Sequence, residues 1–333
     1  MKNKMVSNLV VFILLLSSVI ESSSSGTSNE WELWKATYGK SYLTLEEEKY
    51  RRDTWEENSL LIKTHNTDSD KHGYTLEMNS FGDLTSAEFS SLYNGYRQNL
   101  ETSGSVFSSS LRNAMPSSLD WRDKKVVTDV KNQGKCGSCW AFSTTGSLEG
   151  LHALKTGHLV SLSEQQLMDC SVKYGNNGCD GGNMRSAFQY IKDAGGDDTE
   201  ESYPYTAKNE SCRFDPKKVG ATDEGYVRIP SGDEVSLMHA LYEVGPISVA
   251  MDAGLKTFQF YKKGIYSDYL CSNTHLNHGV TLIGYGESSD GSPYWLVKNS
   301  WGKDWGIDGY FMLARYVGNM CGVATDASYP ILK

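Results

Sequence analysis

The sequence contains no block of five or six lysines or arginines, and its 32 basic residues are outnumbered by 41 acidic ones. A net charge of −9 without a basic block argues against nucleic acid or an anionic membrane surface as the partner. Tandem repeats and heptad runs are also missing. Beyond the first two dozen residues, no apolar stretch approaches the roughly 20 residues of a membrane-spanning helix. With 333 residues, 39% of them hydrophobic, the chain suffices for one large or two modest cores.

Residues 1–22 have the pattern of a secretory signal peptide. Lys2 and Lys4 form a basic start, an apolar core runs from Leu9 to Leu16, and serines follow as small residues for cleavage. A membrane anchor is the alternative, but the apolar run is too short to span a bilayer as a helix. We therefore expect a protein of the secretory pathway, destined for a lysosome, a vacuole or the extracellular space.

The secretory route places the cysteines in an oxidising compartment. There are seven of them, so at least one stays unpaired within the chain. They are Cys136, Cys139, Cys170, Cys179, Cys212, Cys271 and Cys321.

The region before the first cysteine differs from the rest. Residues 28–100 are rich in charge, and a stripe from Glu47 to Asn66 recurs at helical spacing, which predicts a helix with a specific packed face. Residues 103–118 are rich in serine and predict an exposed linker and a site of proteolytic cleavage.

After this linker, helix patterns come first and strand patterns follow. "SCWAFSTTGSLEGLHALKTG" predicts a helix that ends at Gly157, and Ser163 with Gln166 predicts a capping box at the start of another. Two further helices are expected before Gly195 and Gly245. The runs "PISVAMDA", "HGVTLIGYG", "PYWLVKNSWG" and "GYFMLARY" predict strands. A helical half followed by a sheet half indicates two lobes with a cleft between them.

The C-x-x-C pair in "KCGSCW" has three interpretations. A redox couple would pair Cys136 with Cys139 and leave an odd number of other cysteines. A zinc site needs a second ligand pair, and His275 and His278 are more than 130 residues away without a companion motif. In the third interpretation one cysteine is structural and the other, at a helix N-terminus, is a reactive thiolate. No metal or cofactor is expected.

The third interpretation needs a histidine, and His278 is the best candidate. It stands at the entry to a strong strand pattern, whereas most other histidines lie in helical or charged stretches. Asn299 follows another strand, beside two tryptophans. Together with Cys139, these residues predict a nucleophile, a base and an amide that orients the base.

These motifs resemble the papain family of cysteine proteases, in particular cathepsin L. "QGKCGSCWAF" matches the family signature, and the likeness extends to "DWR", "GCDGGNM", "SYPY" and "NSWG". The N-terminal stripe and "MNSFGD" resemble the inhibitory propeptide of that subfamily. The resemblance implies an α+β, papain-like two-lobe fold, with a helical lobe and a β-barrel-like lobe. It divides the chain into a signal peptide (1–22), a helical inhibitory propeptide (23–114) and a mature peptidase domain (115–333).

The resemblance also implies roles for individual residues. It pairs Cys136 with Cys179, Cys170 with Cys212 and Cys271 with Cys321, which leaves Cys139 free; the count alone allows 15 pairings of six cysteines. Gln133 takes the place of the oxyanion donor. The implied substrate-binding residues are Gly182, Met184, Ala250, Leu276, Asn277, Gly279, Trp301 and Asp326.

Asp326 is the residue of this set that departs most from cathepsin L, which has alanine at the floor of the second specificity pocket. Relatives with an acid there accept arginine in the substrate's second position. We expect Asp326 either to act in this way, with its pKa raised by apolar neighbours, or to point to solvent.

The implied activity is that of an endopeptidase made as an inhibited zymogen and acting on extended peptides, with its own propeptide as inhibitor and a monomeric mature form. The alternatives are a Cys–His amidase or transglutaminase-like enzyme and an inactive binding homologue. Asn209 in "NES" is a candidate glycosylation site.

Overall fold

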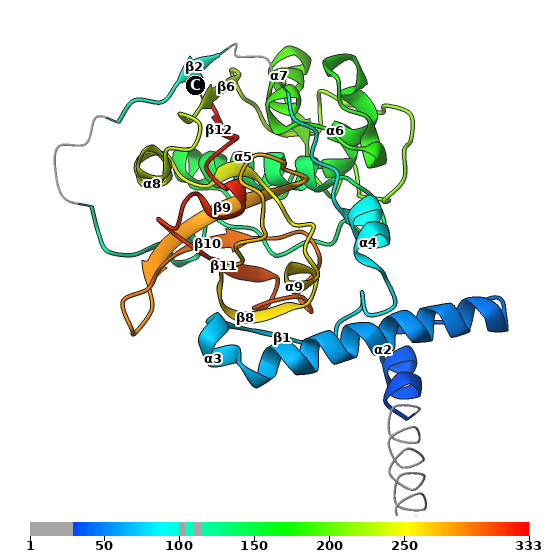
Figure 1. Cartoon of the computed structure of the whole chain (residues 1–333). Helices are drawn as coiled ribbons and strands as arrows, with labels where there is room; N and C mark the ends of the chain where they lie inside the picture. Colours follow the sequence, from blue (N-terminus) through cyan, green and yellow to red (C-terminus); the bar gives the residue numbers. More distant parts are fainter. Residues whose placement is uncertain (1–28, 100–103, 110–114, 333) are drawn as a thin grey trace, which may run out of the picture.

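The structure is a computed structural model that describes residues 29–99, 104–109 and 115–332 (Figure 1). The expected signal peptide and residues 103 and 110–114 of the expected linker lie outside the described residues. Within the described ranges, no helix combines the length and the apolar character that crossing a membrane requires.

The region before the linker is mainly helical. A helical segment covers residues 29–38, and the elements after it are α2 (Leu45–Thr67), α3 (Ser69–His72), β1 (Tyr74–Leu76) and α4 (Ser86–Tyr93); the linker itself contains the short strand β2 (Ser105–Val106). Thr44 caps α2 by accepting the Glu47 N–H. The predicted stripe is confirmed for Trp55, Asn58 and Ile62, which are buried, whereas Glu47 is exposed. In Figure 1 this long helix lies along one side of the larger body, beside β1 and β8.

Four of the helices after the linker agree with the sequence pattern, and the short α9 is an addition to it. These helices are α5 (Cys139–Thr156), α6 (Glu164–Cys170), α7 (Met184–Ala194), α8 (Glu234–Glu243) and α9 (Lys256–Gln259). Gly157 and Gly195 end their helices in the left-handed conformation that glycine adopts without strain. The capping box on α6 is only half formed. Ser163 accepts the Gln166 N–H, but the Gln166 side chain bonds Tyr190 and neighbouring backbone groups instead.

One mixed sheet of ten strands joins the two parts of the described chain. Its order is β1-β8-β11-β10-β9-β7-β12-β6-β2, with β3 paired to β9, so the path is open and has β1 and β2 at its edges. The propeptide-like region therefore supplies both edge strands. The bounds after β2 are β3 (Leu119–Asp120), β6 (Tyr226–Arg228), β7 (Ile247–Met251), β8 (Tyr261–Tyr266), β9 (His278–Glu287), β10 (Pro293–Lys298), β11 (Tyr310–Ala314) and β12 (Ala327–Pro330). A separate pair is formed by β4 (Asp197–Asp198) and β5 (Val219–Ala221).

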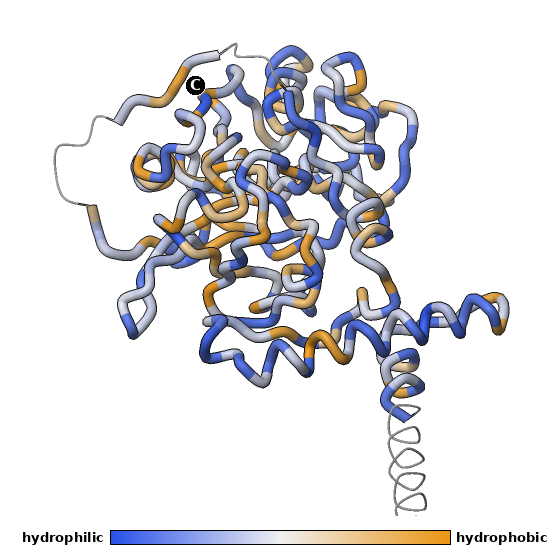
Figure 2. Tube along the Cα trace, viewed as in Figure 1, coloured by the Kyte–Doolittle hydropathy of each residue, from blue (hydrophilic) through white to orange (hydrophobic). Residues whose placement is uncertain are grey.

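The sheet and the helices α5 to α7 form two lobes that meet at α5. Nearly every residue of the first four turns of α5 is buried, and the helix packs against β9 and β7 on one side and α6 and α7 on the other. Figure 2 shows hydrophobic residues concentrated in this interior, whereas α2 is largely hydrophilic. The predicted α+β two-lobe architecture is confirmed, with the strand-rich lobe built as an open sheet.

Three disulfides tie the chain together after the linker. They join Cys136 to Cys179, Cys170 to Cys212 and Cys271 to Cys321. The first two lie in the helical lobe, and the third links the loop before β9 to the chain before β12. All seven cysteines are described, and Cys139 is the one outside a disulfide.

Candidate active site

The unpaired cysteine begins the central helix. Cys139 is the first residue of α5 and is fully buried. Its sulfur accepts N–H groups from Gly279 at 3.3 Å and from Gly95 at 3.2 Å. Gly279 is the second residue of β9, so this contact holds the start of the strand against the sulfur.

His278 and Asn299 lie together at the start of β9 and the end of β10. His278 Nε2 is 2.8 Å from Asn299 Oδ1, and both residues are buried. The Trp301 ring covers the imidazole, with 4.6 Å between the ring centroids. The three residues come together because β9 and β10 pair as antiparallel neighbours, with Lys298 opposite Thr281.

In the proenzyme, burial is the largest influence on the pKa of Cys139 and on that of His278. It raises the pKa of the Cys139 thiol to about 11, although four backbone N–H groups act in the opposite direction. It lowers the pKa of His278 to about 4, and the hydrogen bond to Asn299 offsets only part of that shift. In the proenzyme, burial therefore favours the neutral thiol of Cys139 and the neutral imidazole of His278.

The covering segment is residues 93–97, which begin at the last residue of α4 and reach the sulfur at Gly95. Tyr96 N–H donates to the Asn277 carbonyl at 2.9 Å, and Arg97 N–H donates to the Gly182 carbonyl at 2.8 Å. Gly182 N–H donates in return to the Gly95 carbonyl at 2.9 Å. The segment thus adds a short parallel bridge beside Gly182, which is a β-type mode of recognition.

Gln133 directs its side-chain amide at the same segment. Nε2 donates to the Tyr93 carbonyl and to the Cys136 carbonyl, each at 2.8 Å. Oε1 accepts the Ser300 hydroxyl at 2.7 Å, which fixes the orientation of the amide. A carbonyl oxygen of the covering segment therefore occupies the position that the Gln133 amide faces.

The expected specificity pocket is assembled around one aromatic side chain. Tyr96 is 6% exposed and packs in one cluster with Met184 and Ala250, with Leu276 against its edge. Its hydroxyl donates a hydrogen bond to Asp326. Asp326 therefore faces inward rather than toward solvent.

Two of the expected pocket residues act differently from the expectation. Asn277 contacts Tyr96 through its backbone carbonyl, because its side chain is hydrogen-bonded to Asp252 and Ala253. Asp326 has more than apolar neighbours: Arg185 Nη2 lies 3.2 Å from its carboxylate. Arg185 was not among the residues predicted from the sequence, although a cation in the first turn of a helix is unfavourable by itself and signals a partner elsewhere.

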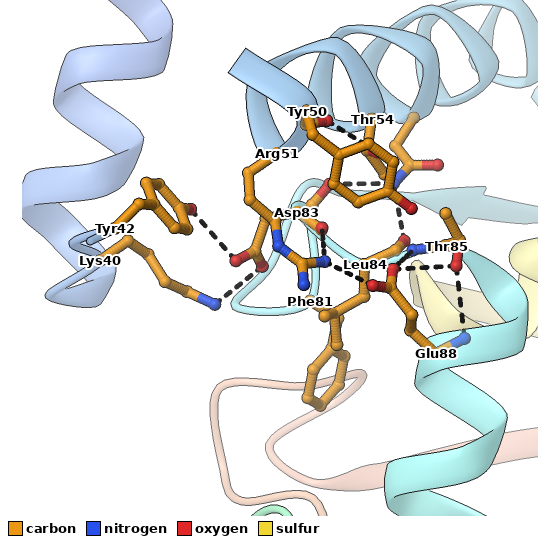
Figure 3. Close-up of polar contacts among 12 residues, drawn as sticks. Lys40, Tyr42, Tyr50, Arg51, Thr54, Phe81, Asp83, Leu84, Thr85 and Glu88 are labelled. Carbon is orange, nitrogen blue, oxygen red and sulfur yellow. Dashed lines mark hydrogen bonds and ion pairs between the residues drawn. The ribbon is translucent and has the colours of Figure 1, made fainter. Parts of the chain in front are cut away.

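The N-terminal region docks by aromatic packing and by a network of charges. Phe89 of α4 lies edge-on to Trp301, with 5.0 Å between centroids, so α4 covers the ring that covers His278. In the network of Figure 3, Lys40 and Tyr42 reach Asp83 at 2.8 and 3.1 Å.

Arg51 connects this network to α4. It donates to the Glu88 carboxylate at 2.8 Å and to the Asp83 backbone carbonyl at 3.1 Å. Glu88 also closes a capping box with Thr85. Glu88 was not among the residues predicted from the sequence, although T-x-x-E is a readable capping signal.

Comparisons with known proteins agree with this arrangement. The model of the "Papain family cysteine protease" matches residues 115–331, and the cathepsin propeptide inhibitor domain (I29) matches residues 31–89. The chain belongs to the papain family of cysteine proteases and carries the inhibitory propeptide of a proenzyme.

Within this family several of the similar proteins are cathepsin L enzymes. Procathepsin L of Rattus norvegicus is 53% identical over 309 residues, covering 91% of this chain and 92% of its own. Cathepsin L2 of Homo sapiens is 50% identical over 327 residues, covering 97% and 98%. Among solved structures, digestive procathepsin L 3 of Tenebrio molitor superposes with a TM-score of 0.85 at 46% identity, covering 92% of this chain and 99% of that one. The chain is thus a cathepsin L-like cysteine protease.

Proposed function

We propose that this proenzyme matures into a cysteine endopeptidase in which Cys139 is the nucleophile, His278 the acid and base, and Asn299 the residue that orients His278. The observation that carries the proposal is the position of the unpaired sulfur. It lies at the start of a helix, bonded to the residue after His278, whose ring is held by Asn299. Nucleophile, base and orienting amide are the parts that acyl transfer requires.

Removal of residues 93–97 allows the chemistry to begin. Once water reaches the pair, the burial that keeps Cys139 and His278 neutral is relieved, and a proton passes from sulfur to imidazole. The thiolate attacks the scissile carbonyl carbon, and His278 gives its proton to the leaving amine. Water then attacks the thioester, with His278 accepting a proton from it, and the acid product leaves as Cys139 is regenerated.

Gln133 fits the role of an oxyanion donor. Its amide already donates to a carbonyl oxygen of the covering segment, and Ser300 holds it in place. In the mature enzyme the same amide and the Cys139 N–H would meet the oxygen on which charge develops. Loss of one such donor typically costs about 10²–10³ in rate.

Extended peptides are the proposed substrates. The backbone groups of Gly182 and Asn277, which bond residues 95–97 in the proenzyme, would bond substrate backbone in the mature form. Met184, Ala250, Leu276 and Gly279 would line the specificity pocket, with Asp326 at its floor and Trp301 over the catalytic imidazole.

Latency and maturation follow from the same contacts. The propeptide would extend over residues 23–114, the mature monomeric enzyme would begin near residue 115, and cleavage would fall at about 110–116. These limits are supported by the matched ranges 31–89 and 115–331. We propose a route through the secretory pathway to a lysosome, a vacuole or the extracellular space, with residues 1–22 as the signal.

The test is peptide hydrolysis by the chain after conversion at acidic pH. Wild type should cleave an extended fluorogenic peptide, and Cys139→Ala should not, while it keeps the unfolding transition of the wild type. No hydrolysis by fully converted wild type would favour an inactive binding homologue. Hydrolysis of simple amides without peptides would favour an amidase.

A further inference from the structure

The pocket that Tyr96 fills has a polar end that belongs to the mature domain. Asp326 lies between β11 and β12, with 14% of its side chain exposed, and it receives the Tyr96 hydroxyl. Removal of the propeptide removes this hydroxyl and leaves the carboxylate at the end of a pocket whose other walls are apolar. A substrate side chain that enters the pocket then meets the same carboxylate.

Arg185 stays beside Asp326 after the propeptide has left, because it belongs to α7. Its side chain is 6% exposed, and its Nη2 contacts the Asp326 carboxylate and donates to the backbone carbonyl of Asn99. The second contact is lost with the propeptide and the first is kept. Arg185 and Asp326 together carry no net charge, and Arg228 adds another cation to the lining of the adjoining cavity.

Resting on the proposed peptidase function, we propose that Arg185 and Asp326 form one specificity element that selects tyrosine in the substrate's second position and rejects arginine. A carboxylate held in place by a guanidinium still has lone pairs for a phenolic hydroxyl, as the Tyr96 contact demonstrates. Phenylalanine fits between the same apolar walls but has no hydroxyl to donate to the Asp326 carboxylate. Arginine brings a second cation to a carboxylate that is already neutralised.

This proposal reverses the expectation drawn from Asp326 alone. An acid at the pocket floor predicts acceptance of arginine only while the acid is the sole charge there. With Arg185 at 3.2 Å, the pocket offers a hydrogen-bond acceptor without excess negative charge.

The experiment measures kcat/KM for four peptides that differ only in the second position, which is tyrosine, phenylalanine, leucine or arginine. Wild type should prefer tyrosine to phenylalanine by about tenfold, the value of one hydrogen bond to a charged acceptor. Asp326→Ala should bring that ratio close to one. Arg185→Gln should raise the arginine-to-leucine ratio about tenfold, since it frees the carboxylate. Arg213→Gln is the matched control, because this exposed arginine pairs with Glu210, and it should change neither ratio.

Ratios within one variant do not depend on how much of it folds. A tyrosine-to-phenylalanine ratio near one in wild type, or one that Asp326→Ala leaves unchanged, would overturn the proposal. An unchanged arginine-to-leucine ratio in Arg185→Gln would do the same. Tyr96→Phe alters only the propeptide, so conversion of this full chain yields the wild-type mature enzyme. Conversion should be faster, because the hydrogen bond from Tyr96 to Asp326 is lost. If wild type cleaves none of the four peptides, the proposed peptidase function is refuted. If it cleaves them without the expected ratios, only the specificity proposal is refuted.

Discussion

Replacing Gly95 with alanine should detach the propeptide from the nucleophile. Gly95 passes so close to the loop before α5 that an added Cβ would lie 1.7 Å from the Gly137 carbonyl oxygen, whereas real Cβ contacts essentially never fall below 3.0 Å. The clash is with backbone on the mature side, which the disulfide from Cys136 and the start of α5 hold in place. The propeptide segment must therefore move.

The cost of this movement follows from the hydrogen bonds that the segment makes. Four bonds depend on its present position: Gly95 N–H to Cys139, Gly182 N–H to Gly95, Tyr96 N–H to Asn277 and Arg97 N–H to Gly182. Each contributes about 0.5–1.5 kcal/mol, so together they are worth about 2–6 kcal/mol. Even the lower value corresponds to roughly a 30-fold larger population in which Cys139 is uncovered.

The assay is the rate at which a thiol-directed epoxide labels Cys139 in the intact chain at neutral pH. Gly95→Ala should be labelled at least about 30-fold faster than wild type. Ser91→Ala, an exposed change one turn earlier on α4, should behave as wild type. Equal labelling rates for Gly95→Ala and wild type would show that residues 93–97 do not control access to the sulfur.

Three further predictions concern stability, maturation and modification. Cys139→Ser should lose peptidase activity and keep its melting temperature, whereas Cys136→Ser opens a disulfide and should lose about 2–5 kcal/mol in a denaturant titration; the reverse pattern would exchange their roles. Although burial acts to raise it, the pKa of Glu88 is lowered by its bonds to Thr85 and Arg51. This stabilisation is present above the unfolded pKa of about 4.3 and is lost as pH falls through the lower folded value. Conversion followed by gel should therefore accelerate below about pH 4.3, and Glu88→Gln should convert faster than wild type at pH 6; equal rates there would remove Glu88 from the mechanism. Asn209 is exposed, and Asn209→Gln should abolish any shift on glycosidase treatment.

The parts of the site that the sequence predicted are those set by local structure. Cys139 begins a helix, His278 begins a strand, and Asn299 follows one, so motif and element together indicate their roles. The pairing of β9 with β10 then brings the last two together. The buried face of α2 was predictable for the same reason, because it follows from helical period.

The parts that were missed depend on contacts between distant segments. Arg185 and Asp326 are 141 residues apart and meet because α7 and the chain before β12 border the same pocket. Tyr96 enters that pocket from the propeptide, 230 residues before Asp326. The pKa shifts of Cys139 and His278 likewise depend on their burial in the assembled fold, which no motif around either residue encodes.

The central claim, that Cys139 performs the chemistry, is tested most directly by titrating the acid-converted enzyme with a thiol-directed epoxide. The remaining peptidase activity and the modified residue are both measured, the latter by mass spectrometry of the digested protein. Activity should fall linearly to zero at one equivalent, with the added mass on Cys139 alone. Activity that survives full modification of Cys139, or that is lost while Cys139 stays unmodified, would contradict the account.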